Sequence, residues 1–155
     1  MIGPRALAML KHFEGCRLHA YADGRGIATI GFGATHYADG SAVKLGDLLT
    51  QEQADALLKH DGERFEGYTR NLLNGAATNG AQFGALLDAC YNAGPGNLGK
   101  SPMLALHRAG KFDAAAKAFL DWHAFEPGLI KRRAAEAALY AGDFDTFDKL
   151  VGYKP

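Results

Sequence analysis

Residues 13–35 read FEGCRLHAYADGRGIATIGFGAT. This stretch follows residues 3–14, where a proline suited to a first helical position precedes leucines at helical spacing. Beyond it come two short strand candidates, RLHAY and IATIGF, joined by the turn-forming ADGRG. The pattern predicts a helix and then a hairpin. It puts one acid, Glu14, on the apolar stripe of the helix and another, Asp23, in the turn.

The chain on either side of the hairpin extends this pattern into one domain. Residues 15–50 are predicted to form a small antiparallel sheet lobe. A capping-box pattern then begins a long connecting helix over residues 50–73. Helical periodicity recurs through residues 79–155. We therefore expect an α+β fold in which a small N-terminal sheet lobe is joined by the long helix to a helical C-terminal lobe.

Charge and hydropathy exclude several classes of protein. The 17 basic residues balance the 17 acidic ones, so the chain lacks the basic field that nucleic-acid binding needs. We see no secretory signal and no apolar run long enough to span a membrane, so we expect no membrane insertion. Two widely spaced cysteines, Cys16 and Cys90, fit a reducing cytoplasm, and the sequence leaves open whether they are free.

Residues 94–101, GPGNLGKS, satisfy the pattern of a phosphate-binding loop. That loop works when it follows a buried parallel strand and begins a helix. Here the preceding segment has helical periodicity, and the whole chain has only six valine and isoleucine residues. We therefore interpret the segment as a connection between two helices.

The two acids of the opening stretch suit cleavage of a glycosidic bond. One carboxyl must be protonated to donate to the leaving oxygen, and the other must be ionised. Glu14, on an apolar stripe, suits the acid, and Asp23, in a polar turn, suits the carboxylate. Thr29 could hold a water beside Asp23. From the residues alone, Glu14 could equally be a helix-end residue or a partner of Arg17, and Asp23 only a turn former.

The same stretch resembles the signature of the phage-type lysozymes, the endolysin family that includes the T-even phage lysozyme. Their pattern is Glu, eight residues, Asp or Cys, five residues and Thr, and Glu14, Asp23 and Thr29 match it. QFGALLDACYNAGPG, KFDAAAKAFLDW and PGLIKRRAAEAALY resemble later helices of the family, so the likeness covers nearly the whole chain. Many relatives have a histidine after TIGxG, where this chain has Ala34, with His36 two residues later.

The resemblance implies a single lysozyme-like catalytic domain over residues 1–155. It implies hydrolysis of the β-1,4 bond between N-acetylmuramic acid and N-acetylglucosamine in peptidoglycan, causing lysis of the host cell. Glu14 would donate the proton, while Asp23 and Thr29 would position a water on the opposite sugar face, which gives inversion. The family uses no metal and no cofactor, and we expect a monomer whose partner is peptidoglycan. The expected location is the host cytoplasm, with release through the inner membrane by a holin-type route.

Three residues are candidates for sugar binding: Thr35, Tyr91 and Ser101. Tyr91 could as well belong to the core, and Ser101 could be only a helix N-cap. Two arginines in the C-terminal part, Arg132 and Arg133, leave two possibilities open: one of them pairs with Glu14, or they form a solvated basic face.

Trp122 is expected in the core.

Two other functions stay open. One is a non-catalytic peptidoglycan-binding domain, which would have no need of the acid set. The other is a lytic transglycosylase, which needs the acid but not a water-positioning pair.

Overall fold

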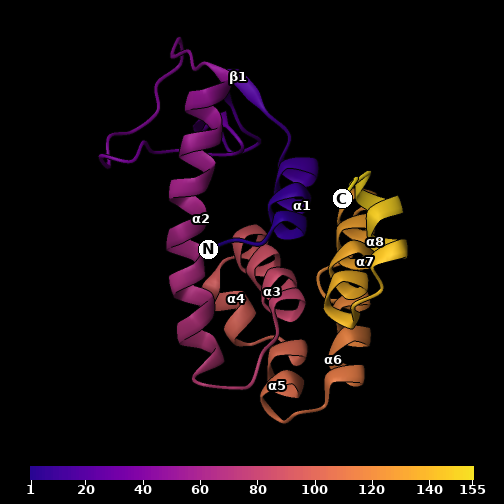
Figure 1. The fold of residues 1–155 in the computed structure, drawn as a ribbon. Helices are drawn as coiled ribbons and strands as arrows, with labels where there is room; N and C mark the ends of the chain where they lie inside the picture. The colour runs from indigo at the N-terminus through magenta and orange to yellow at the C-terminus, as the bar shows by residue number, and fades with distance from the viewer. The chain divides into compact units, whose positions relative to one another are not determined.

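The computed structural model describes residues 1–155 and is a mixed α+β structure (Figure 1). Its elements in chain order are α1 (Pro4–Glu14), β1 (Arg17–Ala22), β2 (Ala28–Gly31), α2 (Gln51–Leu73), α3 (Gly80–Ala93), α4 (Pro95–Gly99), α5 (Pro102–Arg108), α6 (Phe112–Ala118), the 3₁₀ turn η1 (Phe119–Asp121), α7 (Pro127–Ala141) and α8 (Phe144–Val151). A small antiparallel sheet, one long helix and a helical C-terminal part confirm the expected fold class. None of the helices combines the length and the apolar character that a membrane span requires.

The chain divides into two compact units, with boundaries that fall inside α1 and α2. The sheet unit is Leu10–Arg64, and the helical unit consists of Met1–Met9 and Phe65–Pro155. Each unit therefore contains one part of both helices.

The sheet of the sheet unit is smaller than predicted, with two strands only. β1 and β2 run antiparallel, with Tyr21 opposite Thr29 and Ala22 opposite Ala28. The rest of the segment after β2 is turn and loop held by isolated bridges, because its glycines and aspartates favour turns over strands. A buried apolar cluster includes Ile30 of β2 together with Ala34, Val43 and Leu57, and Ala20 of β1 packs against it.

A tight turn follows β2, and it places a glycine beside the end of α1. Ile30 and Ala34 exchange two main-chain hydrogen bonds of 2.9 Å each, which closes a three-residue loop. Within it, Gly31 has φ +64° and Gly33 has φ +90°. Side chains with a Cβ rarely adopt these angles, so the glycines of TIGFG are required by the turn itself.

In the helical unit the core is built on α3, which packs against α7. Asn79 caps α3 in a reciprocal capping box with Gln82, as in the sequence pattern of a helix start. Seven consecutive residues of α3 beyond Phe83 are buried, so this helix has apolar neighbours on nearly every side. α7 ends at Gly142, whose φ of +74° stops the helix.

Two segments differ in detail from the prediction. Residues 94–101 contain the short helix α4 between α3 and α5, with no strand before them. Residues 111–122, KFDAAAKAFLDW, which resemble a later helix of the family, contain α6 and then η1, and the helix stops there because Trp122 has an extended backbone and His123 has φ +48°. Cys16 is exposed, Cys90 is buried, and both are free thiols.

Candidate functional site

Asp23 lies in the turn between β1 and β2, where its carboxylate orders the main chain. Its Oδ1 accepts hydrogen bonds from the amides of Arg25, at 2.8 Å, and Ile27, at 2.9 Å. The Arg25 guanidinium lies 3.5 Å from the other oxygen, Oδ2. The amide of Ile27, with that of Arg25 and the guanidinium, lowers the pKa of Asp23, so the carboxyl is ionised at neutral pH.

Thr29 is joined to the same residue as Asp23, Ile27. Its hydroxyl donates to the carbonyl of Ile27 at 2.9 Å, and this carbonyl also accepts the amide of Asp23 at 2.9 Å. Ile27 therefore holds Asp23 through its N–H and Thr29 through its C=O. Since the proton of the hydroxyl is donated to Ile27, the lone pairs of Thr29 Oγ1 remain to accept a hydrogen bond. Thr29 is only 4% exposed, so it has little freedom to move.

Glu14 is the last residue of α1, and its carboxylate lies against the turn after β2. A Cβ built on Gly33 would be 3.4 Å from Glu14 Oε2. The residue is partly buried. A Cβ at position 33 would therefore come into van der Waals contact with the carboxylate.

Thr35 follows this turn in the sheet unit. Its hydroxyl pairs with His36 Nδ1 at 3.0 Å, and its carbonyl accepts the amide of Val43 at 2.9 Å. His36 is exposed, whereas Ala34, where many relatives have histidine, is buried in the apolar cluster. Glu14, Asp23, Thr29 and Thr35 thus all belong to the sheet unit.

The other two predicted sugar-binding residues belong to the helical unit. Tyr91 on α3 is partly buried, with its ring 4.8 Å from the ring of Phe65. Ser101 is 3% exposed and caps α5: its hydroxyl donates to Leu98 O at 2.7 Å and accepts from Leu104 N at 3.3 Å. The only proton of the Ser101 hydroxyl is used within the fold, so the N-cap alternative describes this residue.

The arginines of α7 are buried, so the solvated basic face considered from the sequence is wrong. Arg132 binds Asp88 of α3 through two hydrogen bonds, of 2.7 and 3.0 Å. Arg133 donates to the carbonyl of Trp122 at 2.8 Å and also binds Glu136 and Asn92. Trp122 is buried as expected, and the Arg133 guanidinium lies 4.8 Å above its ring.

Sequence reasoning missed two residues of the candidate site, Ile27 and Gly33. Ile27 acts through main-chain groups, which every residue except proline possesses, so no side-chain signal marks it. Gly33 was visible only as part of the motif TIGxG. Its positive φ is the physical reason for the glycine. The chain contains no group of three or more histidine, cysteine, aspartate or glutamate residues arranged to hold a metal ion.

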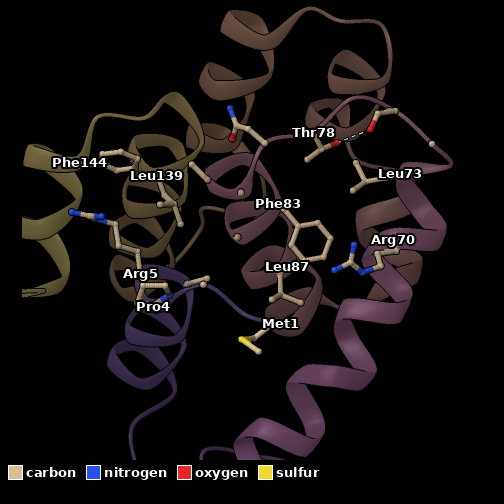
Figure 2. A pocket seen from close by; sticks show the side chains of 18 residues that line it. Met1, Pro4, Arg5, Arg70, Leu73, Thr78, Phe83, Leu87, Leu139 and Phe144 are labelled. Carbon is tan, nitrogen blue, oxygen red and sulfur yellow. Dashed lines mark hydrogen bonds between the residues drawn. The ribbon is translucent and has the colours of Figure 1, made fainter. Parts of the chain in front are cut away.

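A hollow of about 700 Å³ lies in the helical unit and contains none of the predicted site residues. Figure 2 shows Phe83 and Leu87 between Arg5 on one side and Arg70 on the other. Arg70 lies 4.8 Å from the ring of Phe83, and Arg5 lies 4.4 Å from that of Phe144. Arg5 is also ion-paired with an acid outside the hollow, so its charge is already balanced.

Comparison with known proteins identifies the family. A model of the phage lysozyme family matches residues 11–136. The endolysin of Salmonella phage P22 is 37% identical over 142 residues, which cover 90% of this chain and 97% of that protein. The SAR-endolysin of Pseudomonas phage phiKMV is 31% identical over 139 residues, with coverages of 84% and 82%. The solved endolysin of Escherichia coli O157:H7 phage FAHEc1 has a TM-score of 0.85 at 32% identity, covering 92% of this chain and 94% of that one. The chain belongs to the phage lysozyme family and is a glycoside hydrolase.

Proposed function

We propose that this enzyme hydrolyses the β-1,4 bond between N-acetylmuramic acid and N-acetylglucosamine of bacterial peptidoglycan, with Glu14 as the general acid and Asp23 and Thr29 positioning the attacking water. The observation that carries the proposal is the main chain of Ile27, whose N–H donates to Asp23 and whose C=O accepts from Thr29. Two side chains that could bind one water are thereby fixed relative to each other.

The protonation states of the two side chains suit this role. Asp23 Oδ1 is occupied by two amides, so Oδ2 is the oxygen that would accept a proton of the water. Thr29 would accept the second proton, because its own is donated to Ile27. A water bound in this way has its oxygen lone pairs directed away from both acceptors. The lowered pKa of Asp23 keeps it charged, which also stabilises a cationic sugar in the transition state.

Glu14 is the group that would protonate the leaving oxygen. Its carboxylate lies at the end of α1 close to Gly33, 3.4 Å from the position of a Cβ built on that glycine. A fixed position matters for an acid, because proton transfer requires hydrogen-bond distance to the leaving oxygen. For the sugar rings we retain Thr35 and Tyr91 as contacts. We do not retain Ser101, whose proton is used in capping α5.

Two isosteric variants test the acid set. Glu14→Gln removes the transferable proton, and we expect hydrolysis to fall at least about a hundredfold, the lower end of acid–base contributions. Asp23→Asn keeps an Oδ1 that can accept both amides but loses the charge, so we expect a comparable loss with the turn preserved. Release of reducing ends from purified peptidoglycan measures the rate, and thermal unfolding checks the fold. Near wild-type rates in either variant would refute the role given to that residue.

Thr29 allows a matched pair of variants. Thr29→Val preserves the shape and removes the hydroxyl, and we expect the rate to fall about tenfold, the worth of one hydrogen bond. Thr29→Ser preserves the hydroxyl and should retain most of the rate. Equal rates for the two variants would show that the hydroxyl holds no water.

The products distinguish hydrolysis from transglycosylation. Hydrolysis adds one water to each cleaved bond, so the muropeptides should carry reducing ends. A lytic transglycosylase instead forms an anhydro sugar of lower mass. Mass spectrometry of the released muropeptides that found only anhydro ends would refute hydrolysis.

The further parts of the proposal concern the whole molecule. Residues 1–155 would act as one catalytic domain and as a monomer, reaching peptidoglycan from the host cytoplasm by a holin-type exit through the inner membrane. Expression in a bacterium should then cause lysis only when a separate pore-forming agent opens that membrane. Lysis without such an agent would show that the enzyme crosses by another route.

A further inference from the structure

The connection between α2 and α3 contains the dipeptide Asn–Gly twice (Figure 1). Asn74–Gly75 directly follows the last residue of α2, and Asn79–Gly80 lies at the start of α3. Asparagine before glycine is prone to deamidation, because glycine has no side chain to hinder the attack of its amide nitrogen on the asparagine. The sequence does not distinguish the two sites, whereas their structures differ.

Asn79 is held in place by the cap of α3. Its Oδ1 accepts the amide of Gln82 at 2.8 Å, and its own amide donates to Gln82 Oε1 at 3.0 Å. Gly80 is the first residue of the helix, which fixes its nitrogen. The Asn79 side chain would have to leave the cap before its Cγ could reach that nitrogen, and loss of an N-cap destabilises a helix. The fold therefore protects Asn79.

Asn74 has none of these restraints. Its side chain is exposed and makes no hydrogen bond with the rest of the chain. The amide of Gly75 donates to no group of the chain, whereas the amides of Asn74 and Ala76 donate to the carbonyls of Arg70 and Leu73. The nucleophilic nitrogen and the side chain that it would attack can thus approach each other without first breaking a hydrogen bond.

We propose that Asn74 is a site of spontaneous deamidation in the folded protein, with water as the co-reactant. The nitrogen of Gly75 loses its proton to solvent and attacks Cγ of Asn74. A C–N bond forms, the bond from Cγ to the side-chain nitrogen breaks, and that nitrogen takes up a proton from solvent and leaves as ammonia. Water then opens the resulting succinimide ring at either carbonyl, which leaves aspartate or isoaspartate.

The modification changes the charge of the protein. Either product adds a negative charge to a chain whose formal net charge is zero. Folded protein kept in solution should therefore develop a more acidic form, which isoelectric focusing separates from the original. Asn74 belongs to the helical unit, whereas the proposed acid set belongs to the sheet unit, so this inference is independent of the proposed function.

Incubation in water enriched in the heavy isotope of oxygen tests the proposal, because each opened ring takes up oxygen from that water. Peptide mass spectrometry then compares residues 74 and 79, in the folded protein and in guanidinium chloride. In the folded protein we expect residue 74 to be labelled about tenfold faster than residue 79, which corresponds to the cost of breaking an N-cap. In denaturant the two rates should be similar, because the cap no longer exists.

Two variants form a matched pair. Asn74→Gly removes the reactive side chain, and glycine readily adopts the φ of +48° at this position, so neither the label nor the acidic form should appear there. Asn79→Ser keeps a capping hydroxyl and should leave both unchanged.

The contrary outcomes are distinct. Equal labelling of residues 74 and 79 in the folded protein would refute the proposal. So would labelling of residue 74 in the folded protein at only a small fraction of its rate in denaturant, since the loop would then protect it. An acidic form that persists in Asn74→Gly would refute Asn74 as its source.

Discussion

Three turn aspartates of the sheet unit and two buried acids of the helical unit are held in opposite ways. In the sheet unit, Asp23, Asp39 and Asp47 lie in turns and accept hydrogen bonds from groups a few residues away. These bonds lower the pKa of all three carboxyls. Each acid stabilises a local turn, and it does so in its charged form.

In the helical unit, Asp88 and Glu136 are fully buried and face Arg132 and Arg133. Burial raises the pKa of Glu136 well above its ordinary value, and the nearby Asp88 raises it further, against the opposing effect of Arg133. Glu136 Oε2 has no hydrogen-bond partner while the group is ionised, because the neighbouring carboxylate of Asp88 can only accept. A proton on this oxygen would satisfy it.

The difference shows what each kind of acid contributes. An acid in a turn stabilises the conformation of a few neighbouring residues, and its hydrogen bonds are strongest when the carboxyl is ionised. Asp88, a buried acid of α3, binds Arg132 of α7 across 44 residues of sequence, and its removal takes a carboxylate from a buried arginine. These two groups of acids should therefore respond differently to mutation and to pH.

The largest expected effect comes from breaking the buried pair. Asp88→Ala removes the buried carboxylate to which Arg132 donates two hydrogen bonds, and we expect the free energy of unfolding to fall by about 3–5 kcal/mol. The control in the sheet unit is Asp55→Ala, which breaks an exposed pair with Lys11 and should cost about 1 kcal/mol or less. Denaturant unfolding of both variants measures the contrast. Similar losses would show that burial does not separate the two pairs.

The next effect is a change of stability with pH. The folded pKa of Glu136 is raised, so above its ordinary value of 4.5 the folded state binds more protons than the unfolded state, and stability falls as the pH rises. Glu136→Gln does not titrate and can still donate to Asp88. Below pH 4.5 we expect the stability difference between this variant and the wild type to stay constant. Above pH 4.5 we expect the wild type to lose stability relative to the variant. Unfolding temperatures at pH 4 and pH 8 test this, and a constant difference between the two proteins would show that folding does not raise the pKa of Glu136.

A smaller effect of opposite sign is expected at Asp47. Its pKa is lowered by the amide of Lys44 and the hydroxyl of Tyr37, so its contribution is present above the ordinary value of 3.8 and is lost as the pH falls below it. Asp47→Asn should therefore be less stable than the wild type at pH 7, and the two should converge toward pH 2. Thermal unfolding across this range follows the convergence. A gap that persists in acid would assign the loss to geometry and not to charge.

The smallest effect is expected at the residue that mimics a phosphate-binding lysine. Lys100 is exposed at the end of α4, and Lys100→Ala should leave hydrolysis within a few-fold of wild type. ATP should leave the unfolding temperature unchanged. A ligand at 100 times its dissociation constant would stabilise the native state by about 2.7 kcal/mol, so real binding would be visible.

Local signals in the sequence predicted much of the fold and the position of the candidate site. The switch from helical to strand spacing after Glu14 and the capping pattern at Asn79 both depend on neighbouring residues, so one chain suffices to see them. The burial of Arg132 is different. Arginines on a helix are typical of a solvated face, and only the pairing with Asp88, 44 residues away, reverses that interpretation. No local pattern contains this information.

The extent of the sheet and the geometry of the site could not be predicted from the sequence, because both depend on main-chain hydrogen bonds. The strand pattern did not show that pairing ends at Gly31, because that depends on the turn that Ile30 and Ala34 close. The connection of Asp23 to Thr29 runs through main-chain groups, which are chemically the same at every residue. The motif gave the two residues, and only the structure shows what joins them.

That connection has an evolutionary consequence. Asp23 and Thr29 are aligned by the N–H and C=O of residue 27, while the Ile27 side chain is 41% exposed. Natural drift at this position can therefore exchange one side chain for almost any other without disturbing the pair. Only proline, which lacks the N–H, would release Asp23. The position can diverge widely among descendants of this enzyme and still be indispensable, so its variability in a lineage would be a poor guide to its importance.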